Sequence, residues 1–213
     1  MKNRCRFCAV SEDQRSFGAA DTKLASDGHY FAIPSIGSLV EGWTLIVPNE
    51  HCVSLRAHYG NSDFGAFVAD VAGKVRDIYG SVIAFEHGAN HEGSATGCGT
   101  DHAHLHIVPF DGIDVRDLDS SGVMFHPMDT ADIAQVVGSS EYLAFFPDIV
   151  AKPTYALVAI LDTSISQFFR RLIGHKLGLS AEEIDYRKSP RLDVASATVA
   201  ALTPAFETAT ENE

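Results

Sequence analysis

The amino-acid sequence predicts an α+β fold built on an antiparallel sheet, and three features support this. Residues 30–33 and 43–47 have strand-like apolar patterns, each ends at a proline, and glycine and polar residues join them as in a hairpin. Residues 61–80 carry apolar side chains at helical spacing, between an Asn-Ser-Asp start signal and a terminal glycine. Two more strand patterns follow at residues 82–85 and 102–109, which places the helix between the hairpin and the last of these strands.

The second half of the chain is expected to form an α/β extension. Residues 111–140 are rich in Asp, Ser and Gly. No linker pattern divides the chain, so an extension of residues 111–213 is expected to pack on a core of residues 1–110 as one structural unit. The elements predicted for the extension are a short helix near residues 130–137, strands at 143–146 and 155–160, a helix at 164–177 with Ser164 near its cap, a helix at 193–202 ending near Pro204, and a frayed tail at 206–213.

Composition and charge exclude some classes of function. The chain has 213 residues, is 46% hydrophobic and 21% charged, and carries a formal net charge of −12. Such an acidic protein is not expected to bind nucleic acid, which requires clustered Lys and Arg, although a local site can still attract a small anion. No apolar run is long enough for a signal peptide or a membrane span, so we expect a cytoplasmic protein with reduced thiols and no membrane partner.

Three histidines at two-residue spacing, His102, His104 and His106, are the most informative local pattern. Successive side chains of a strand point to opposite faces, so the three imidazoles are expected on one face, roughly 6–7 Å apart. Such a row can supply a nucleophile, an acid or base, and a metal ligand. A lone histidine is commonly a core residue, and an exposed strand face needs only polar residues, but three in register favour a site of chemistry.

Cys5 and Cys8 form a Cys-x-x-Cys pair, a spacing that lets two thiolates hold one tetrahedral metal ion. A redox pair and two unrelated thiols are the alternatives. His51 and His102 are the expected additional ligands of a structural zinc ion, with Cys52 as a rival to His51.

At these residues the chain resembles the histidine triad (HIT) superfamily of nucleotide hydrolases and transferases. Residues 102–108 match its pattern of three histidines alternating with apolar residues, and residues 42–51 resemble its hairpin strand ending in Pro-x-x-His. The Cys-x-x-Cys pair resembles the start of zinc-bearing members. The resemblance covers roughly residues 5–110 and implies a HIT-like sheet and a homodimer.

The resemblance also implies roles for individual residues. His104, the middle histidine, would attack the α-phosphate of a nucleotide, and water or another acceptor would resolve the nucleotidyl-histidine intermediate. His106 would contact the phosphate or assist protonation of the leaving group. His51 and His102 occupy the positions of metal ligands in zinc-bearing relatives, where a closed four-ligand site is structural.

The loop before the triad departs from the family pattern. Many hydrolases carry Gly-Gln-Ser or Gly-Gln-Thr there, whereas this chain has Gly97, Cys98 and Gly99. A Gly-Cys pair resembles the galactose-1-phosphate uridylyltransferase branch, but that branch usually replaces the third histidine by glutamine, and this chain keeps His106. The two glycines still allow backbone amides to approach a phosphate, and Gln167 is our hypothesis for the missing polar group. Alternatively, Gln167 and the neighbouring arginines form the solvated face of a helix.

The expected base pocket lies at Tyr30, Phe31 and Ile33, although such residues in a strand are more commonly core. The leading expectation is a hydrolase that acts on a small nucleotide substrate, such as a dinucleoside polyphosphate or a nucleoside phosphoramidate. A nucleotidyltransferase or phosphorylase of the same superfamily is the first alternative. A nucleotide-binding regulatory module with little turnover is the second.

Overall fold

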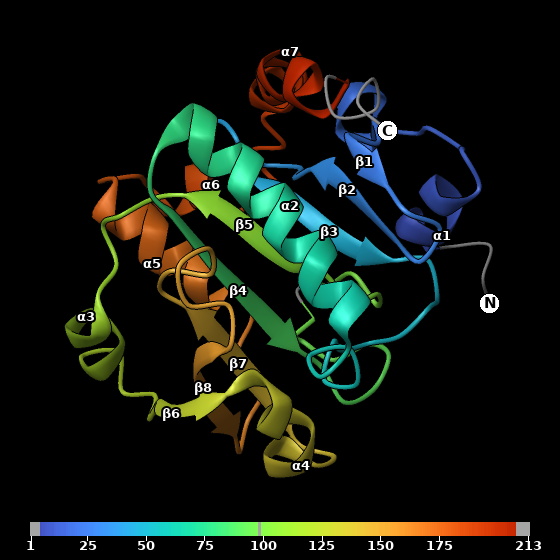
Figure 1. The fold of residues 1–213 in the computed structure, drawn as a ribbon. Coiled ribbons are helices and arrows are strands. Elements are labelled where there is room, and N and C mark those ends of the chain that lie inside the picture. Colours follow the sequence, from blue (N-terminus) through green and yellow to red (C-terminus); the bar gives the residue numbers. More distant parts are fainter. Residues whose placement is uncertain (1–4, 98, 208–213) are drawn as a thin grey trace.

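The computed structural model describes residues 5–97 and 99–207, and it confirms the predicted α+β class. One eight-stranded sheet, in the order β1-β2-β3-β5-β4-β7-β8-β6, forms the centre of the molecule, and every neighbouring pair in it is antiparallel (Figure 1). The strands are β1 (Ala25–Ser26), β2 (Tyr30–Pro34), β3 (Thr44–Pro48), β4 (Val82–Gly88), β5 (Leu105–Pro109), β6 (His126–Asp129), β7 (Glu141–Phe146) and β8 (Tyr155–Leu161).

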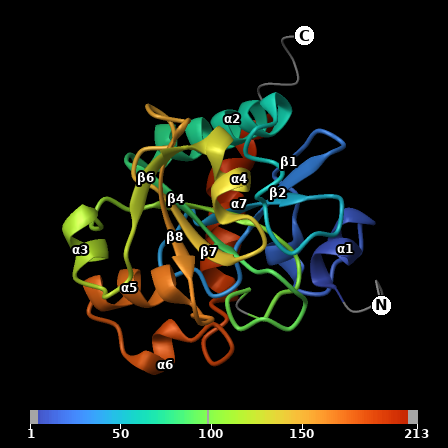
Figure 2. The same ribbon diagram turned by 90° about the horizontal axis from the view of Figure 1, so that it is seen from below.

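Helices cover both faces of the sheet, with α2 on one side and α5 and α6 on the other (Figure 2). Two separate apolar clusters result: one holds the buried sides of α2 and α7, the other those of α1, α3 and α5. The helices are α1 (Arg6–Ser11), α2 (Ser62–Tyr79), α3 (Val115–Asp119), α4 (Ile133–Val137), α5 (Phe168–Lys176), α6 (Ala181–Ile184) and α7 (Leu192–Glu207), with short 3-10 helices η2 (Gly18–Asp21) and η3 (Thr130–Asp132). Among the described residues, none of these helices has the length and apolarity that crossing a membrane requires.

Helix α2 forms where its apolar spacing predicts it. The Asn61 side chain accepts a hydrogen bond from the Asp63 amide at the N-terminus, and Gly80 ends the helix with a φ of 89°, which favours glycine. The buried side includes Phe64, Val68 and Val71 in the expected pattern, whereas Ile78 is 42% exposed at the last turn. Helix α2 therefore packs over the centre of the sheet through most of the predicted face.

The strand that carries the histidines is shorter than predicted, because β5 begins at Leu105. The ladder between β5 and β3 starts at the Ile46–Leu105 pair. The backbone before Leu105 instead bonds to the segment that follows β3, where the Ala103 amide donates to the Cys52 carbonyl at 2.7 Å. His102 and His104 thus lie just before the strand, and only His106 lies within it. Side-chain alternation nevertheless persists, so Ala103 and Leu105 join the apolar cluster under α2, on the other face from His106.

The sheet continues from the first half of the chain into the second without a break. Strand β7 pairs with β4 from Ala84–Phe146 to Gly88–Tyr142, and β8 pairs with β7. The predicted strands at 143–146 and 155–160 and the helix near 130–137 are therefore present, while β6 and α3 arise in a segment predicted to be mostly a connection. The extension completes the sheet in which the histidine strand lies.

Two helix boundaries were predicted wrongly. Helix α5 begins at Phe168 because Gln167 has a left-handed backbone with φ of 53° and because the Ser164 hydroxyl donates to Glu141. Helix α7 continues through Pro204 to Glu207, at the cost of one backbone hydrogen bond, because its last turn packs on the α2 side of the sheet. Phe206, expected in a frayed tail, is 8% exposed there, and residues 208–213 lie outside the described part of the chain.

We predict that Gly88→Ala destabilises the fold, because a Cβ at Gly88 would lie 2.1 Å from the ring of Tyr142 on β7. Overpacking of this kind costs about 1–3 kcal/mol of unfolding free energy. Gly73→Ala in α2 is the matched control: its Cβ would meet nothing within 4 Å, and alanine should stabilise the helix by roughly 0.5–1 kcal/mol. Urea unfolding of both variants measures the difference, and equal stabilities would contradict the close β4–β7 packing.

Candidate active site

A cavity of about 360 Å³ lies on the sheet face that carries His106. Strands β3, β4 and β5 supply its floor, while α1, the loop before His104 and the α5–α6 region supply its walls. The register explains the floor, because His106 pairs with Leu45 on β3 and with Phe85 on β4. The cavity is lined by Arg6, Phe7, Phe17, Ser35, Ile36, Trp43, Leu45, Phe85, His87, Gly99, Thr100, His104, His106, Gln167, Arg170 and Tyr186.

His104 has one nitrogen available for chemistry. Its Nδ1 lies 2.9 Å from the backbone carbonyl oxygen of His102. A carbonyl can only accept a hydrogen bond, so Nδ1 carries the proton and Nε2 keeps its lone pair. Burial lowers the pKa of His104 to about 4, against the opposing effect of the hydrogen bond to His102, so the ring is neutral at pH 7. This is the form in which an imidazole can act as a nucleophile.

His106 has the opposite tautomer. The indole Nε1–H of Trp43 donates to Nδ1 of His106 at 2.9 Å, and an indole can only donate, so the single ring proton lies on Nε2. The ring stacks on Phe85 with centroids 4.5 Å apart. Burial, followed by the nearby His104, lowers the pKa of His106 well below its usual value. The centroids of His104 and His106 are 4.7 Å apart, closer than the spacing predicted for an extended strand, because His104 precedes β5.

His87, which could approach the substrate but was not among the predicted site residues, is a third imidazole on the same face. It continues the alternation of Ile83 and Phe85 along β4, and its ring centroid is 6.0 Å from that of His106. Both of its ring nitrogens are buried and have no hydrogen-bond partner among the described residues. Burial lowers the pKa of His87 to about 3, so this ring is also neutral. The period-two pattern of β4 was the signal that could have identified it.

Cys5, Cys8, His51 and His102 form a cluster that could hold a metal ion, with the four ligand atoms within 4.8 Å of one another. Nδ1 of His102 lies 3.3 Å from Cys5 Sγ and 3.7 Å from Cys8 Sγ, and Nδ1 of His51 lies 3.3 Å from Cys8 Sγ. Tetrahedral bonds of zinc to sulfur and nitrogen would place these atoms about 3.5 Å apart. The donor set and its spacing therefore fit a tetrahedral metal ion.

The far nitrogens of the two histidines are held in the way metal ligands usually are. Nε2 of His102 lies 2.9 Å from the Pro48 carbonyl, and Nε2 of His51 lies 3.4 Å from a Glu92 carboxylate oxygen. Cys52, the rival ligand, is outside the cluster: its Sγ lies 3.7 Å from Nε2 of His58, and burial raises the pKa of its thiol to about 12.

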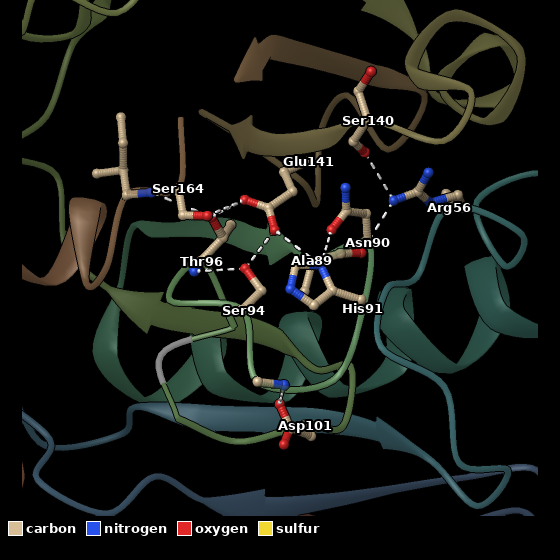
Figure 3. A network of polar contacts seen from close by, with 12 residues as sticks. Arg56, Ala89, Asn90, His91, Ser94, Thr96, Asp101, Ser140, Glu141 and Ser164 are labelled. Carbon is tan, nitrogen blue, oxygen red and sulfur yellow. Dashed lines mark hydrogen bonds and ion pairs between the residues drawn. The ribbon is translucent and has the colours of Figure 1, made fainter. Parts of the chain in front are cut away.

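A buried carboxylate fixes the loop that precedes His102. Glu141, at the start of β7, accepts hydrogen bonds from the hydroxyls of Ser94, Thr96 and Ser164 (Figure 3). The Gly93 amide donates to Asp101 at 2.7 Å, which closes the base of the loop. Burial raises the pKa of Glu141, but the three hydroxyls together outweigh it and lower the pKa below 4.5. The carboxylate is therefore charged at neutral pH and ties the loop to the extension.

Only some of the expected substrate-binding residues line the cavity. Gly99 and Gln167 do, Gly97 lies in the turn closed by the Thr100 amide, and Cys98 lies outside the described residues. Tyr30 lies on the opposite face of the sheet, with its ring against α2.

The grouping of Tyr30 with Phe31 and Ile33 was wrong because neighbouring residues of a strand face opposite ways. Phe31 and Ile33 lie on the cavity side but are 0% exposed, as members of the apolar cluster.

The extension supplies one wall of the cavity, and Arg170 and Tyr186 in this wall were not among the predicted site residues. Arg170 was grouped with Arg171 as a solvated helix face, but Arg170 is 6% exposed and only Arg171 is exposed. The Arg170 guanidinium donates to the carbonyls of Gly37 and Ile184 and lies over the indole of Trp43, 5.7 Å from the ring centroid. The burial of Arg170 depends on contacts with residues that are distant in the sequence, so no local sequence pattern predicts it.

We predict that Glu141→Gln loosens the loop and lowers stability by about 1–3 kcal/mol near neutral pH, as expected when buried hydroxyls lose a charged acceptor. A carboxyl whose folded pKa is depressed stabilises the fold above its unfolded pKa of 4.5 and loses this effect as pH falls through the folded value. The difference between wild type and variant should therefore shrink on acidification, measured by thermal unfolding from pH 7 to pH 3. Glu183→Gln is the control, since that carboxylate also accepts a serine hydroxyl but is exposed; a constant wild-type–variant difference would contradict the assigned charge.

Neither a known family profile nor a curated protein sequence matches this chain. Seven chains of solved structures match it. One of them, a HIT family protein from Bacillus subtilis, is similar over 56% of this chain and 92% of its own length, with 20% identical residues and a TM-score of 0.38.

Proposed function

We propose that this protein is a nucleotide hydrolase that acts at the α-phosphate through a nucleotidyl-histidine intermediate on His104. The observation that carries the proposal is the pair of opposite tautomers in one cavity: a free Nε2 lone pair on His104 beside an Nε2–H donor on His106. A nucleophile next to a hydrogen-bond donor is the arrangement that phosphoryl attack requires. The histidine triad pattern in the sequence supports the same chemistry.

The charges around the cavity suit an anionic substrate. The protein as a whole has a formal net charge of −12, yet the described residues that line the cavity include two arginines and no carboxylate. Arg6 is paired with Asp21, whereas Arg170 bonds to backbone carbonyls, which carry no net charge. A local field of this kind attracts an anion to an acidic protein. The polar side, with the three histidines and Gln167, would take the phosphate groups. The apolar side, with Phe17 and Ile36, would take the base.

The reaction proceeds in two displacements. In the first, the His104 Nε2 lone pair forms a bond to the α-phosphorus, and the bond from phosphorus to the leaving group breaks with its electron pair. The Nδ1–H of His104 stays bonded to the His102 carbonyl, so the intermediate carries a positive ring next to the anionic nucleotidyl group. In the second, water attacks phosphorus, the P–N electron pair returns to Nε2, and the water proton passes to solvent. Use of another acceptor in place of water would make the protein a transferase.

We propose zinc as the ion of the four-ligand cluster. Two thiolates and two imidazoles are a preferred zinc donor set, and four protein ligands leave no open position for substrate, so the ion would be structural. It would join α1 to the loop after β3 and to the residues before β5. Reduced thiols suit this role, which is consistent with a cytoplasmic location.

Replacement of His104 tests the proposed chemistry. Wild type incubated separately with dinucleoside polyphosphates, nucleoside phosphoramidates and nucleotide sugars should form a covalent nucleotidyl adduct with at least one of these classes, detected by intact-protein mass spectrometry. His104→Asn should form none and lose roughly 10³-fold or more in kcat, since the nucleophile is removed. The absence of both adduct and turnover with all three substrate classes would reject the enzyme in favour of a nucleotide-binding module, which equilibrium binding of the same compounds would reveal.

Metal analysis tests the cluster separately. The protein purified with zinc present should contain about one zinc ion per chain, and Cys8→Ser should contain almost none, because three ligands bind far more weakly. Cys52→Ser is the matched control and should retain the ion, since Cys52 lies outside the cluster. A chelator should lower the unfolding temperature of wild type but not of Cys8→Ser. Loss of zinc from both cysteine variants would point to a different ligand set.

A further inference from the structure

The hydrogen bond from Trp43 to His106 decides which protons His106 can carry. With the indole N–H directed at Nδ1 at 2.9 Å, a proton on that nitrogen would place two N–H groups head to head. His106 therefore has one proton, on Nε2. A neutral imidazole can donate a hydrogen bond from this position, but release of its only proton would create an imidazolate, which is not accessible near neutral pH.

The surroundings of Trp43 hold this arrangement in place. The indole is 1% exposed and packs edge-on against Phe85, with ring centroids 5.8 Å apart. The Arg170 guanidinium lies over the indole ring and is itself fixed by the carbonyls of Gly37 and Ile184. A second proton on His106 would also add positive charge close to this buried guanidinium. The extension thus acts on the histidine through Arg170 and Trp43.

We propose that Trp43 is a positioning residue that keeps His106 a neutral hydrogen-bond donor, so that the site stabilises the phosphate but gives no proton to the leaving group. Resting on the proposed function, this restricts the substrates to nucleotides whose leaving group departs as a stable anion. Phosphoanhydrides fit, because phosphate, polyphosphate or sugar phosphate leaves with the electron pair of the broken P–O bond and needs no proton. Amines and alkoxides, which must be protonated as they leave, do not fit.

Other groups that line the cavity offer few substitutes as proton donor. The guanidinium groups of Arg6 and Arg170 stay protonated, since arginine does not deprotonate in proteins. His87 is neutral and packed against the rings of Phe85 and Phe169, so it likewise has no second proton to give. The phenol of Tyr186 is the remaining candidate donor among these titratable lining residues, and the experiment includes its removal.

The test is the dependence of kcat/KM on the leaving group, with the full chain and a series of nucleoside 5′-monophosphate aryl esters. From nitrophenol to unsubstituted phenol, wild-type kcat/KM should fall roughly 10²-fold or more, the size of a missing general-acid contribution. In Trp43→Phe, which keeps the aromatic packing and removes the N–H, His106 can take a second proton, and the fall should shrink by about tenfold. Tyr186→Phe should leave the steep fall unchanged. A shallow fall in wild type, or a fall that steepens in Tyr186→Phe, would overturn the proposal.

A spectroscopic measurement keeps the inference independent of turnover. Nitrogen-15 NMR of the histidine rings at pH 7 should show His106 protonated only at Nε2 in wild type, with Nδ1–H appearing in Trp43→Phe. Trp43 is the single tryptophan of the chain, so its indole N–H resonance is unambiguous. Arg170→Met should shift that resonance, whereas Arg171→Met, its exposed neighbour, should not.

His106 protonated at Nδ1 in wild type would overturn the inference even if the nucleotidyl-histidine were found. If no ester were turned over and no adduct formed, the proposed function would fall, while the NMR result would still decide the tautomer.

Discussion

The site depends on His102, which joins two structures through two different groups. Its imidazole turns Nδ1 toward Cys5 and Cys8, and its backbone carbonyl accepts the Nδ1–H of His104. The candidate metal cluster therefore lies next to the carbonyl that fixes the tautomer of the proposed nucleophile. This arrangement also explains why β5 starts only at Leu105: His102 and His104, which precede it, contribute to the cluster and to the cavity instead of a strand ladder.

The second half of the chain is part of the site rather than an addition to it. Strand β7 completes the sheet beside β4, and Glu141 at its start holds the loop that leads to His102. From α5, Arg170 reaches across to Trp43 and to the Gly37 carbonyl near the β2–β3 connection. A protein with the same histidine strand but without these elements would lack one wall of the cavity and the group that stabilises Trp43.

The sequence was sufficient where local periodicity determines the structure. Helix α2, the β2–β3 hairpin and the opposite orientation of Ala103 and the histidines all follow from apolar spacing. It was insufficient where a residue's environment is set by distant partners. Ser164 has the sequence context of a helix cap, but a buried carboxylate takes its hydroxyl.

The candidate site likewise contains some features that local sequence patterns predict and others that depend on distant residues. Cys5, Cys8, His51 and His102 come together as expected. His51 follows β3 and His102 precedes β5, and these two strands pair, while the Cys-x-x-Cys spacing places both thiols at the start of α1. The contact of Trp43 with His106 depends on the register of β3 against β5, and the burial of Arg170 depends on the path of the extension. Neither has a period or a motif in the sequence. His87 is only partly predictable. The alternation along β4 predicts which face of the sheet its side chain lies on, but not that its ring nitrogens have no hydrogen-bond partner among the described residues.

Burial lowers the pKa of all three imidazoles of the cavity, and at His106 the indole N–H of Trp43 adds a second constraint. They lie on an apolar row of the sheet, and no described carboxylate lines the cavity to stabilise an imidazolium. A site whose histidines carry no second ring proton is poorly suited to general acid catalysis but well suited to nucleophilic attack, which needs a free lone pair. Positive charge comes instead from guanidinium groups, which attract an anion without exchanging protons with it. The cavity thus separates charge stabilisation from proton transfer, and the hydrogen bond that Trp43 donates to His106 enforces that separation at the imidazole beside the proposed nucleophile.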